Sequence, residues 1–261
     1  MSLQSQDYCW HSPIPPAPPA QGWNDVFFIH PTTGWVVGES GAILKTTDGG
    51  ASWRRQQSGT NAYLTGVQFA DTNTGWAVGY KGTILKTSNG GHSWEEQASP
   101  TKSSLHDVFF KDAQTGWAVG WSGAILKTTD GGAHWQSQVS GTQLALEAVH
   151  FTDTQKGYAA GLGGRILKTD DGGATWTIHS TGTLQWLYDV YFIDDQTGWA
   201  VGDRGAILRT TDGGNKWDVQ TVDPANDLKA VYFTSHQTGW AVGKKGTMFS
   251  TSDGGVHWQQ Q

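Results

Sequence analysis

The chain has 261 residues, 36 of them Gly and 15 of them Trp, and it carries a formal net charge of -6. So much Gly argues against a helix-rich protein and favours turns and short strands, and the negative charge excludes nucleic-acid binding through a basic patch. No apolar run approaches the roughly 20 residues that cross a bilayer, so we expect no membrane span.

Residues 1–22 form the first unit and differ from the rest of the chain. Met1–Leu3 resembles an expression leader, and no apolar signal-peptide core follows it. The run Ser12–Pro19 is expected to form extended polyproline. We interpret this run as a strap that packs on the domain, and the alternative is a ligand for an SH3-type domain.

From residue 23 to residue 261 the chain is one domain made of six copies of a 41-residue unit. An aromatic residue after a Gly recurs at that period, and a second Trp follows each of these aromatics 18 residues later. The first series is Trp35, Trp76, Trp117, Tyr158, Trp199 and Trp240, and the second is Trp53, Trp94, Trp135, Trp176, Trp217 and Trp258. We expect all twelve side chains in the core, because each aromatic can bury about 150–250 Å².

Each copy predicts four strands in the same order. The first strand has apolar residues two apart, such as Val67 and Phe69, and the second reads Gly-Trp-Ala-Val-Gly. The third reads Gly-Ala-Ile-Leu-Lys-Thr, and the fourth begins at the second Trp, with Gly-rich turn signals between them. Four short strands in about 40 residues are the signature of a propeller blade, whereas a helical solenoid needs apolar residues three and four apart. The sequence therefore predicts an all-β, six-bladed β-propeller of four-stranded antiparallel blades.

The turn before the fourth strand carries the motif Thr-x-Asp-x-Gly-x-x-Trp, which resembles the Asp-box, or bacterial neuraminidase repeat. Its acidic or amide residues are Asp48, Asn89, Asp130, Asp171, Asp212 and Asp253. We interpret the motif as structural, because the carboxylate accepts hydrogen bonds from turn amides while Gly supplies a positive φ. Calcium is the alternative, but each copy offers one regular carboxylate where calcium takes six to eight oxygens. We expect neither a metal nor another cofactor.

The third strand also carries a cation at the same position in five of the six copies. The series is Lys45, Lys86, Lys127, Lys168 and Arg209, and Ser250 ends it. We interpret these side chains as lying along the blades, with their aliphatic stems over neighbouring aromatics. The alternative is a positively charged channel.

Two sets of loops vary while the rest of the repeat does not. These are the two residues inside Gly-x-x-Gly and the connections from each fourth strand to the next first strand, which should open on one face. The candidate partner-binding residues there are Tyr63, Tyr80, Lys81, Trp121, Trp186, Arg204, Lys244 and Lys245. Aromatics among charges are typical of protein-interface anchors. Neutral drift at solvent-facing turns is the alternative.

The two ends of the chain compete for one place in the last blade. Trp10, in Tyr8-Cys9-Trp10, lies 16 residues before Val26, close to the 14 that separate Trp53 from Val67. It would add a ring-closing strand to the last blade, yet the segment that begins at Trp258 also reads as a fourth strand. The sequence leaves both arrangements open.

The unit Thr-Gly-Trp-Ala-Val-Gly-x-x-Gly-x-Ile-Leu-Lys-Thr-Thr-Asp-Gly-Gly-x-x-Trp resembles the photosystem II stability and assembly factor (Ycf48-like) family over about residues 22–258. The resemblance implies a non-enzymatic, protein-binding scaffold that is exported to the periplasm, the thylakoid lumen or the outside of the cell. It also implies that the natural signal peptide is absent from this chain. The photosynthetic members resemble seven-bladed propellers with an arginine-rich patch, whereas this chain has six copies and five Arg.

Two other functions fit the repeat less well. A lectin-like propeller would use the loop aromatics to bind carbohydrate, and inhibition by saccharides would reveal it. A sialidase needs three arginines around a carboxylate and a Tyr activated by a Glu, and the four Glu of this chain offer little to pair with a Tyr. We therefore expect no enzyme. We also expect a monomer, with a blade-swapped dimer as the alternative, because Gly41–Gly50 and Gly123–Gly132 are identical.

Overall fold

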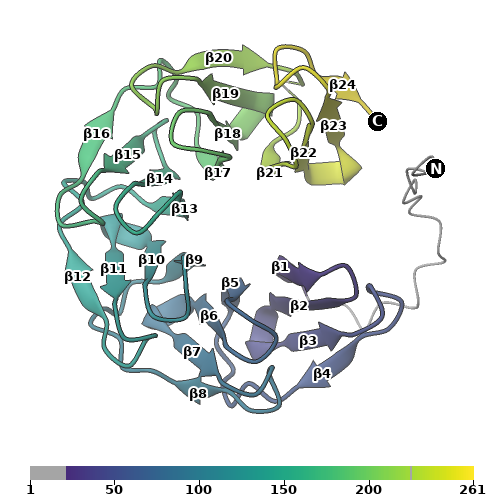
Figure 1. The fold of residues 1–261 in the computed structure, drawn as a ribbon, viewed down its shortest axis with the longest axis vertical. Helices are drawn as coiled ribbons and strands as arrows, with labels where there is room; N and C mark the ends of the chain where they lie inside the picture. The colour runs from purple at the N-terminus through teal and green to yellow at the C-terminus, as the bar shows by residue number, and fades with distance from the viewer. Residues whose placement is uncertain (1–21, 224) are drawn as a thin grey trace, which may run out of the picture.

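The computed structural model, which describes residues 22–223 and 225–261, is a six-bladed propeller of four-stranded antiparallel sheets. Figure 1 shows the sheets arranged around an axis, with the first strand of each blade innermost and the fourth outermost. The predicted fold class is confirmed. None of the helices in the described part is long and apolar enough to cross a membrane.

The two inner strands of each blade match the predicted segments. The first strands are β1 (Trp23–His30), β5 (Leu64–Phe69), β9 (Leu105–Phe110), β13 (Leu146–Phe151), β17 (Leu187–Phe192) and β21 (Leu228–Phe233). The second strands are β2 (Thr33–Gly38), β6 (Gly75–Gly79), β10 (Gly116–Gly120), β14 (Gly157–Gly161), β18 (Gly198–Gly202) and β22 (Gly239–Gly243). The Gly that opens the second strand is required by packing, because a Cβ on Gly75 would lie 2.5 Å from the ring of Phe69.

The two outer strands complete each blade. The third strands are β3 (Ile43–Thr46), β7 (Ile84–Thr87), β11 (Ile125–Thr128), β15 (Ile166–Thr169), β19 (Ala206–Thr210) and β23 (Met248–Thr251). The fourth strands are β4 (Arg54–Gln56), β8 (Glu95–Glu96), β12 (Gln136–Gln138), β16 (Thr177–His179), β20 (Asp218–Thr221) and β24 (Gln259–Gln260). Short 3-10 turns join second to third strands in five blades: η1 (Glu39–Gly41), η2 (Tyr80–Gly82), η3 (Trp121–Gly123), η4 (Asp203–Gly205) and η5 (Lys244–Gly246).

One contact repeats at every junction between consecutive blades. Trp35 stacks on Phe69 of the next blade at 3.5 Å between ring centroids, and its indole N–H donates to the carbonyl of Gly90, 3.2 Å away. Trp76, Trp117 and Trp199 make the same stack and the same hydrogen bond. The fourth blade has a Tyr at this position, and its hydroxyl donates to the carbonyl of Gly213 instead (3.1 Å). This aromatic series therefore holds consecutive blades together by ring stacking and hydrogen bonding.

The repeating cations lie over these aromatics. The Nζ atom of Lys45 is 5.0 Å from the ring centroid of Trp35, and Lys86 and Lys127 lie similarly over Trp76 and Trp117. Lys45 also donates to the carbonyl of Gly90 (3.0 Å). The interpretation of these side chains as covers for the aromatics is confirmed for the first three blades.

The last member of the series departs from the expectation that all twelve aromatics are core. Trp240 is 36% exposed, whereas Trp199, one blade earlier, is fully buried. No blade among the described residues follows the sixth, and Figure 1 shows the ring interrupted between the yellow sheet and the purple one. In the second series Trp94, Trp135 and Trp217 are buried, while the other three are half-buried. An aromatic of the first series is therefore buried only where a following blade covers it.

The structure shows which segment forms the fourth strand of the last blade. β24 pairs with β23 through Phe249 opposite Gln260 and Ser250 opposite Gln259, so the segment after Trp258 is its fourth strand. The alternative strand at Tyr8–Trp10 and the Pro-rich strap lie outside the described residues.

Candidate protein-binding face

The two sets of variable loops lie on one face of the propeller, which we call the loop face. In each blade the first residue of the turn after the second strand donates its N–H to the carbonyl of the residue before the first strand. Tyr80 donates in this way to Tyr63 (2.9 Å), and Trp121 to Ser104 (2.9 Å). The same bond joins Glu39 to Gly22, Leu162 to Ala145, Asp203 to Trp186 and Lys244 to Asp227. Turns and connections therefore sit side by side, as the sequence predicts.

The middle residue of each turn has a positive φ, which is unfavourable for a residue other than Gly. Lys81 has φ 59° and Arg204 has φ 55°, values in the left-handed region, and the fourth blade places Gly163 there. A non-Gly residue in this region costs about 1–2 kcal/mol. Five blades have a residue other than Gly at this position. Of these residues, Lys81, Arg204 and Lys245 are exposed.

Two of the predicted aromatics form a pair. The rings of Tyr63 and Tyr80 lie 4.7 Å apart, and the hydroxyl of Tyr63 donates to Asn24 Oδ1 (2.9 Å). Tyr80 is 44% exposed, so one side of the pair is open to solvent, while the Tyr63 hydroxyl anchors the other side. The structure thus brings these two residues together from a connection and a turn of one blade.

The other two predicted aromatics lie on separate blades, and neither contacts another predicted aromatic. Trp121 is 51% exposed and its ring contacts the ring of His106 edge-on, 5.9 Å between centroids. Trp186 is half-buried and stacks on Tyr188 at 5.6 Å. Trp121 is therefore the more accessible of the two.

The predicted cations divide into free and paired side chains. Lys244 forms an ion pair with Asp227 at 2.7 Å, which raises the pKa of Lys244 and lowers that of Asp227. Within the described chain, Lys81, Arg204 and Lys245 make no ion pair. Lys244 is thus held in place by its neighbour, and the other three remain available to a ligand.

A hollow on the propeller axis, in the middle of the loop face, is the feature that sequence reasoning missed. It has a volume of about 390 Å³ and is lined by residues from all six blades. The second residue of each first strand forms its rim: Asn24, Thr65, His106, Glu147, Tyr188 and Lys229. The signal was present in the sequence, because this column of the repeat changes its chemistry from copy to copy as the turns do.

The rim side chains are linked to one another and to the predicted residues. His106 Nδ1 lies 2.9 Å from Glu147 Oε2, and Lys229 Nζ lies 2.9 Å from the ring centroid of Tyr188. The hydroxyl of Tyr188 donates to Asp203 Oδ1 (2.7 Å). Every predicted aromatic therefore touches a rim residue, either directly or through its stacked neighbour, so rim and turns form one continuous surface.

A layer of three carboxylates lies below the rim, on alternate blades. Asp25, Asp107 and Asp189 occupy this position in the first, third and fifth blades, and Gly66, Ala148 and Ala230 occupy it in the others. The carboxylate of Asp189 accepts from the N–H of Val190 and from that of Val231 in the next blade, both at 2.8 Å. Burial raises the pKa of Asp189 to about 6 and raises the pKa of Asp25 and Asp107 as well. Asp25 and Asp107 accept the equivalent bonds from Val67 and Val149, so each of the three carboxylates links its own blade to the next.

The Asp-box residues lie at the opposite ends of the strands from the loop face. Asp48 Oδ1 accepts from the hydroxyl of Thr46 and from the N–H of Ser52, both at 2.8 Å, and these bonds lower the pKa of Asp48 to about 2. Asn89 accepts the equivalent bonds from Thr87 and Ser93. Asp130, Asp171, Asp212 and Asp253 repeat the pattern. In the described chain, no group of three or more His, Cys, Asp or Glu is placed to hold a metal ion.

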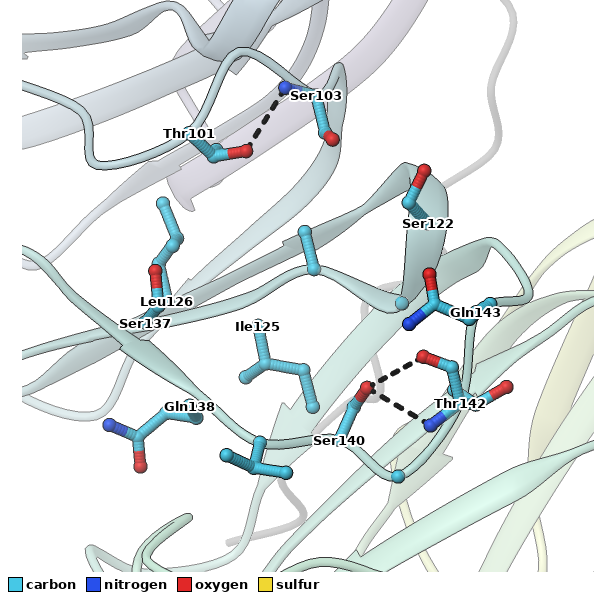
Figure 2. A pocket seen from close by; sticks show the side chains of 14 residues that line it. Thr101, Ser103, Ser122, Ile125, Leu126, Ser137, Gln138, Ser140, Thr142 and Gln143 are labelled. Carbon is cyan, nitrogen blue, oxygen red and sulfur yellow. Dashed lines mark hydrogen bonds between the residues drawn. The ribbon is translucent and has the colours of Figure 1, made fainter.

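A second hollow, of about 420 Å³, lies at the edge of the third blade (Figure 2). Small side chains open it: Ser137 replaces the Arg55, Glu96 and Ile178 of other blades. Figure 2 shows hydroxyl groups around it, with Ser140 and Thr142 hydrogen-bonded to each other. It carries no charged side chain, so it offers less for recognition than the loop face.

Comparison with known proteins gives a family and a fold. The model of the family described as photosynthesis system II assembly factor YCF48 matches residues 17–96, 92–180 and 178–261. The solved structure of "YCF48 bound to D1 peptide" is 23% identical with a TM-score of 0.76, over 92% of this chain and 80% of that chain. YCF48 from Cyanidioschyzon merolae is also 23% identical with a TM-score of 0.76, over 94% and 86%.

Enzymes share the fold at lower identity. The GH74 enzyme of Niastella koreensis is 15% identical with a TM-score of 0.73, and the match covers 87% of this chain and 43% of that one. At this identity the likeness concerns the fold alone. No curated relative matches the chain.

Proposed function

The chain belongs to the photosynthesis system II assembly factor YCF48 family, and from this premise we propose that it is a non-enzymatic scaffold that binds a partner protein on its loop face. A solved relative of the same fold carries a bound peptide. We propose the same class of ligand here, an extended segment of a partner protein, and an exported location for the encounter.

The observation that carries the proposal is the continuity between rim and turns. Tyr80 and Trp121 are exposed aromatics on neighbouring blades, and both adjoin the hollow on the axis through Tyr63 and His106. Aromatic anchors supply most of the binding energy of protein interfaces, and surrounding charges set specificity. Lys81 and Arg204 would meet acidic groups of the partner from the same side.

Selection from a displayed peptide library tests the proposal. The immobilised protein is offered random twelve-residue peptides, and the dissociation constant of an enriched peptide is measured by fluorescence polarisation. We expect the double variant Tyr80→Ala/Trp121→Ala to bind at least tenfold more weakly, because a hot-spot aromatic contributes about 2 kcal/mol or more. The double variant Ile178→Ala/Val219→Ala removes exposed apolar side chains from outer strands and should bind like the parent.

Two results would count against a protein-binding loop face. Equal weakening in both variants would place the site elsewhere on the molecule. Displacement of the peptide by oligosaccharides at millimolar concentration would favour the lectin-like alternative.

A further inference from the structure

The interruption of the ring leaves two apolar sheet faces uncovered. On the sixth blade Trp240 is 36%, Val242 39% and Met248 40% exposed, whereas their equivalents one blade earlier are fully buried. On the first blade Val26 and Phe28 are 54% and 38% exposed, and their equivalents in the second blade are buried. We call these surfaces the open faces of the sixth and first blades.

The repeat defines the chemistry that would cover the open face of the sixth blade. At the five internal junctions a ring lies parallel to the aromatic of the preceding blade, with centroids 3.4–3.6 Å apart. A backbone carbonyl also accepts that aromatic's polar hydrogen. Among the described residues Trp240 has neither partner. Its occupant should therefore offer a flat ring and unpaired carbonyls.

The segment of residues 1–21 has that chemistry. It contains Tyr8, Trp10 and the proline-rich run Ser12–Pro19, which holds five of the eight prolines of the chain. Polyproline exposes its carbonyls because it makes no internal hydrogen bonds, and proline rings dock on aromatic-lined surfaces. Eight residues in this conformation span about 25 Å, which is long enough to cover the roughly 20 Å of a six-residue strand.

The described start of the first blade resembles the connections between the other blades. In the five other blades the residues before the first strand come from the fourth strand of the preceding blade. Gly22 makes the same contact as those connections, since its carbonyl accepts from the N–H of Glu39 (3.1 Å). If the chain before Gly22 follows the route of those connections, it reaches the first blade from the side on which the open faces lie.

We propose that residues 1–21 pack between the sixth and first blades, with the run Ser12–Pro19 against Trp240. A segment tethered this close has an effective concentration in the millimolar range, so it outcompetes a second copy of the chain at micromolar concentration. The ring is then completed by an extended strap rather than by a strand of the last blade, whose fourth position β24 already fills.

Cys9 allows a direct test, because it is the single cysteine of the chain. A nitroxide label on Cys9 of the full chain broadens nuclear magnetic resonance signals of nearby groups. We expect broadening of the indole signal of Trp240 and of the methyl signal of Met248, while the indole of Trp117, across the ring, stays sharp. Reduction of the nitroxide should restore both affected signals.

A variant keeps the test independent of the label's position. Pro15→Ser/Pro16→Ser/Pro18→Ser should abolish the broadening at Trp240 and lower the melting temperature by several degrees, whereas Gln4→Ser/Gln6→Ser should change neither. Equal broadening over all six blades would overturn the proposal. So would broadening of Trp240 that appears only between labelled and unlabelled molecules in a mixture, because a second copy would then be the occupant.

Discussion

At the scale of single residues, the carboxylates below the rim contribute less to the free energy of unfolding as the pH rises. Burial raises the pKa of Asp189 to about 6, above its ordinary value of 3.8. A group whose pKa is raised by folding stabilises the protein fully below its unfolded pKa, and that contribution is lost as the pH rises through the folded pKa. The pKa values of Asp25 and Asp107 are raised in the same direction, so all three carboxylates contribute less to stability as the pH rises.

Asp189→Ala tests this pH dependence. We expect the difference in unfolding free energy between the parent and the variant to decrease as the pH rises from 4 to 7, measured by urea unfolding at each pH. Asp48→Ala is the control, because hydrogen bonds lower the pKa of Asp48 to about 2. The contribution of Asp48 should be constant between pH 5 and 7. A constant difference for Asp189 as well would show that its pKa is not raised.

The one Tyr in the stacking series isolates the hydrogen bond from the stack. Tyr158 stacks on Phe192 at 3.6 Å and donates its hydroxyl to the carbonyl of Gly213. Tyr158→Phe keeps the ring and should lower the unfolding free energy by about 1 kcal/mol, since the buried carbonyl loses its donor. Tyr232→Phe, at an exposed tyrosine of the sixth blade, should leave it unchanged. Equal effects would mean that the junction depends on ring stacking alone.

At the scale of elements, the Asp-box turn shows why one motif tolerates two residues. Asp130 accepts from the hydroxyl of Thr128 and the N–H of His134, at 2.8 and 2.9 Å, and Asn89 accepts the equivalent bonds in the second blade. Both side chains present one oxygen in the same place. The turn therefore requires an acceptor rather than a charge.

Substitution in the third blade checks this requirement. Asp130→Ala removes the acceptor and should lower the unfolding free energy, because the turn N–H and the Thr128 hydroxyl lose their partner, whereas Asp130→Asn should lower it much less. Urea denaturation of the two variants measures both values. An Asn variant as unstable as the Ala variant would instead indicate that the turn needs the negative charge.

The strands and turns of this protein could be predicted from sequence because their causes are local and repeated six times. The Gly that opens each second strand and the Trp after it are fixed by contacts such as that of Gly75 with Phe69. The hollow on the axis could not be predicted in the same way, because Glu147 and His106 lie 41 residues apart and meet only when the blades close around the axis. The exposure of Trp240 was predicted wrongly for a related reason. The repeat marks it as core, yet burial depends on a blade that the described chain does not contain.

At the scale of the whole molecule, the blades resemble the units of a linear repeat array whose ends differ from its middle. Stability in such arrays is approximately the sum of the terms for each repeat and for each junction between neighbours. The third and fourth blades each have two complete junctions, whereas the first and sixth have one. The two end blades should therefore open locally at a lower free energy than the middle ones.

Native-state hydrogen exchange measures this difference with an internal control. The segments 115–128, 197–210 and 238–251 begin with the same six residues, Thr-Gly-Trp-Ala-Val-Gly, so their intrinsic exchange rates over that stretch are nearly equal. We expect the amides of Ala118 and Ala200 to exchange more slowly than that of Ala241, because the third and fifth blades each make two blade-to-blade junctions whereas the sixth makes one. Equal protection at all three positions would mean that the face around Trp240 is covered as completely as an internal junction. Protection of Ala241 that falls in the Pro15→Ser/Pro16→Ser/Pro18→Ser variant, while that of Ala118 stays constant, would attribute the cover to the N-terminal segment.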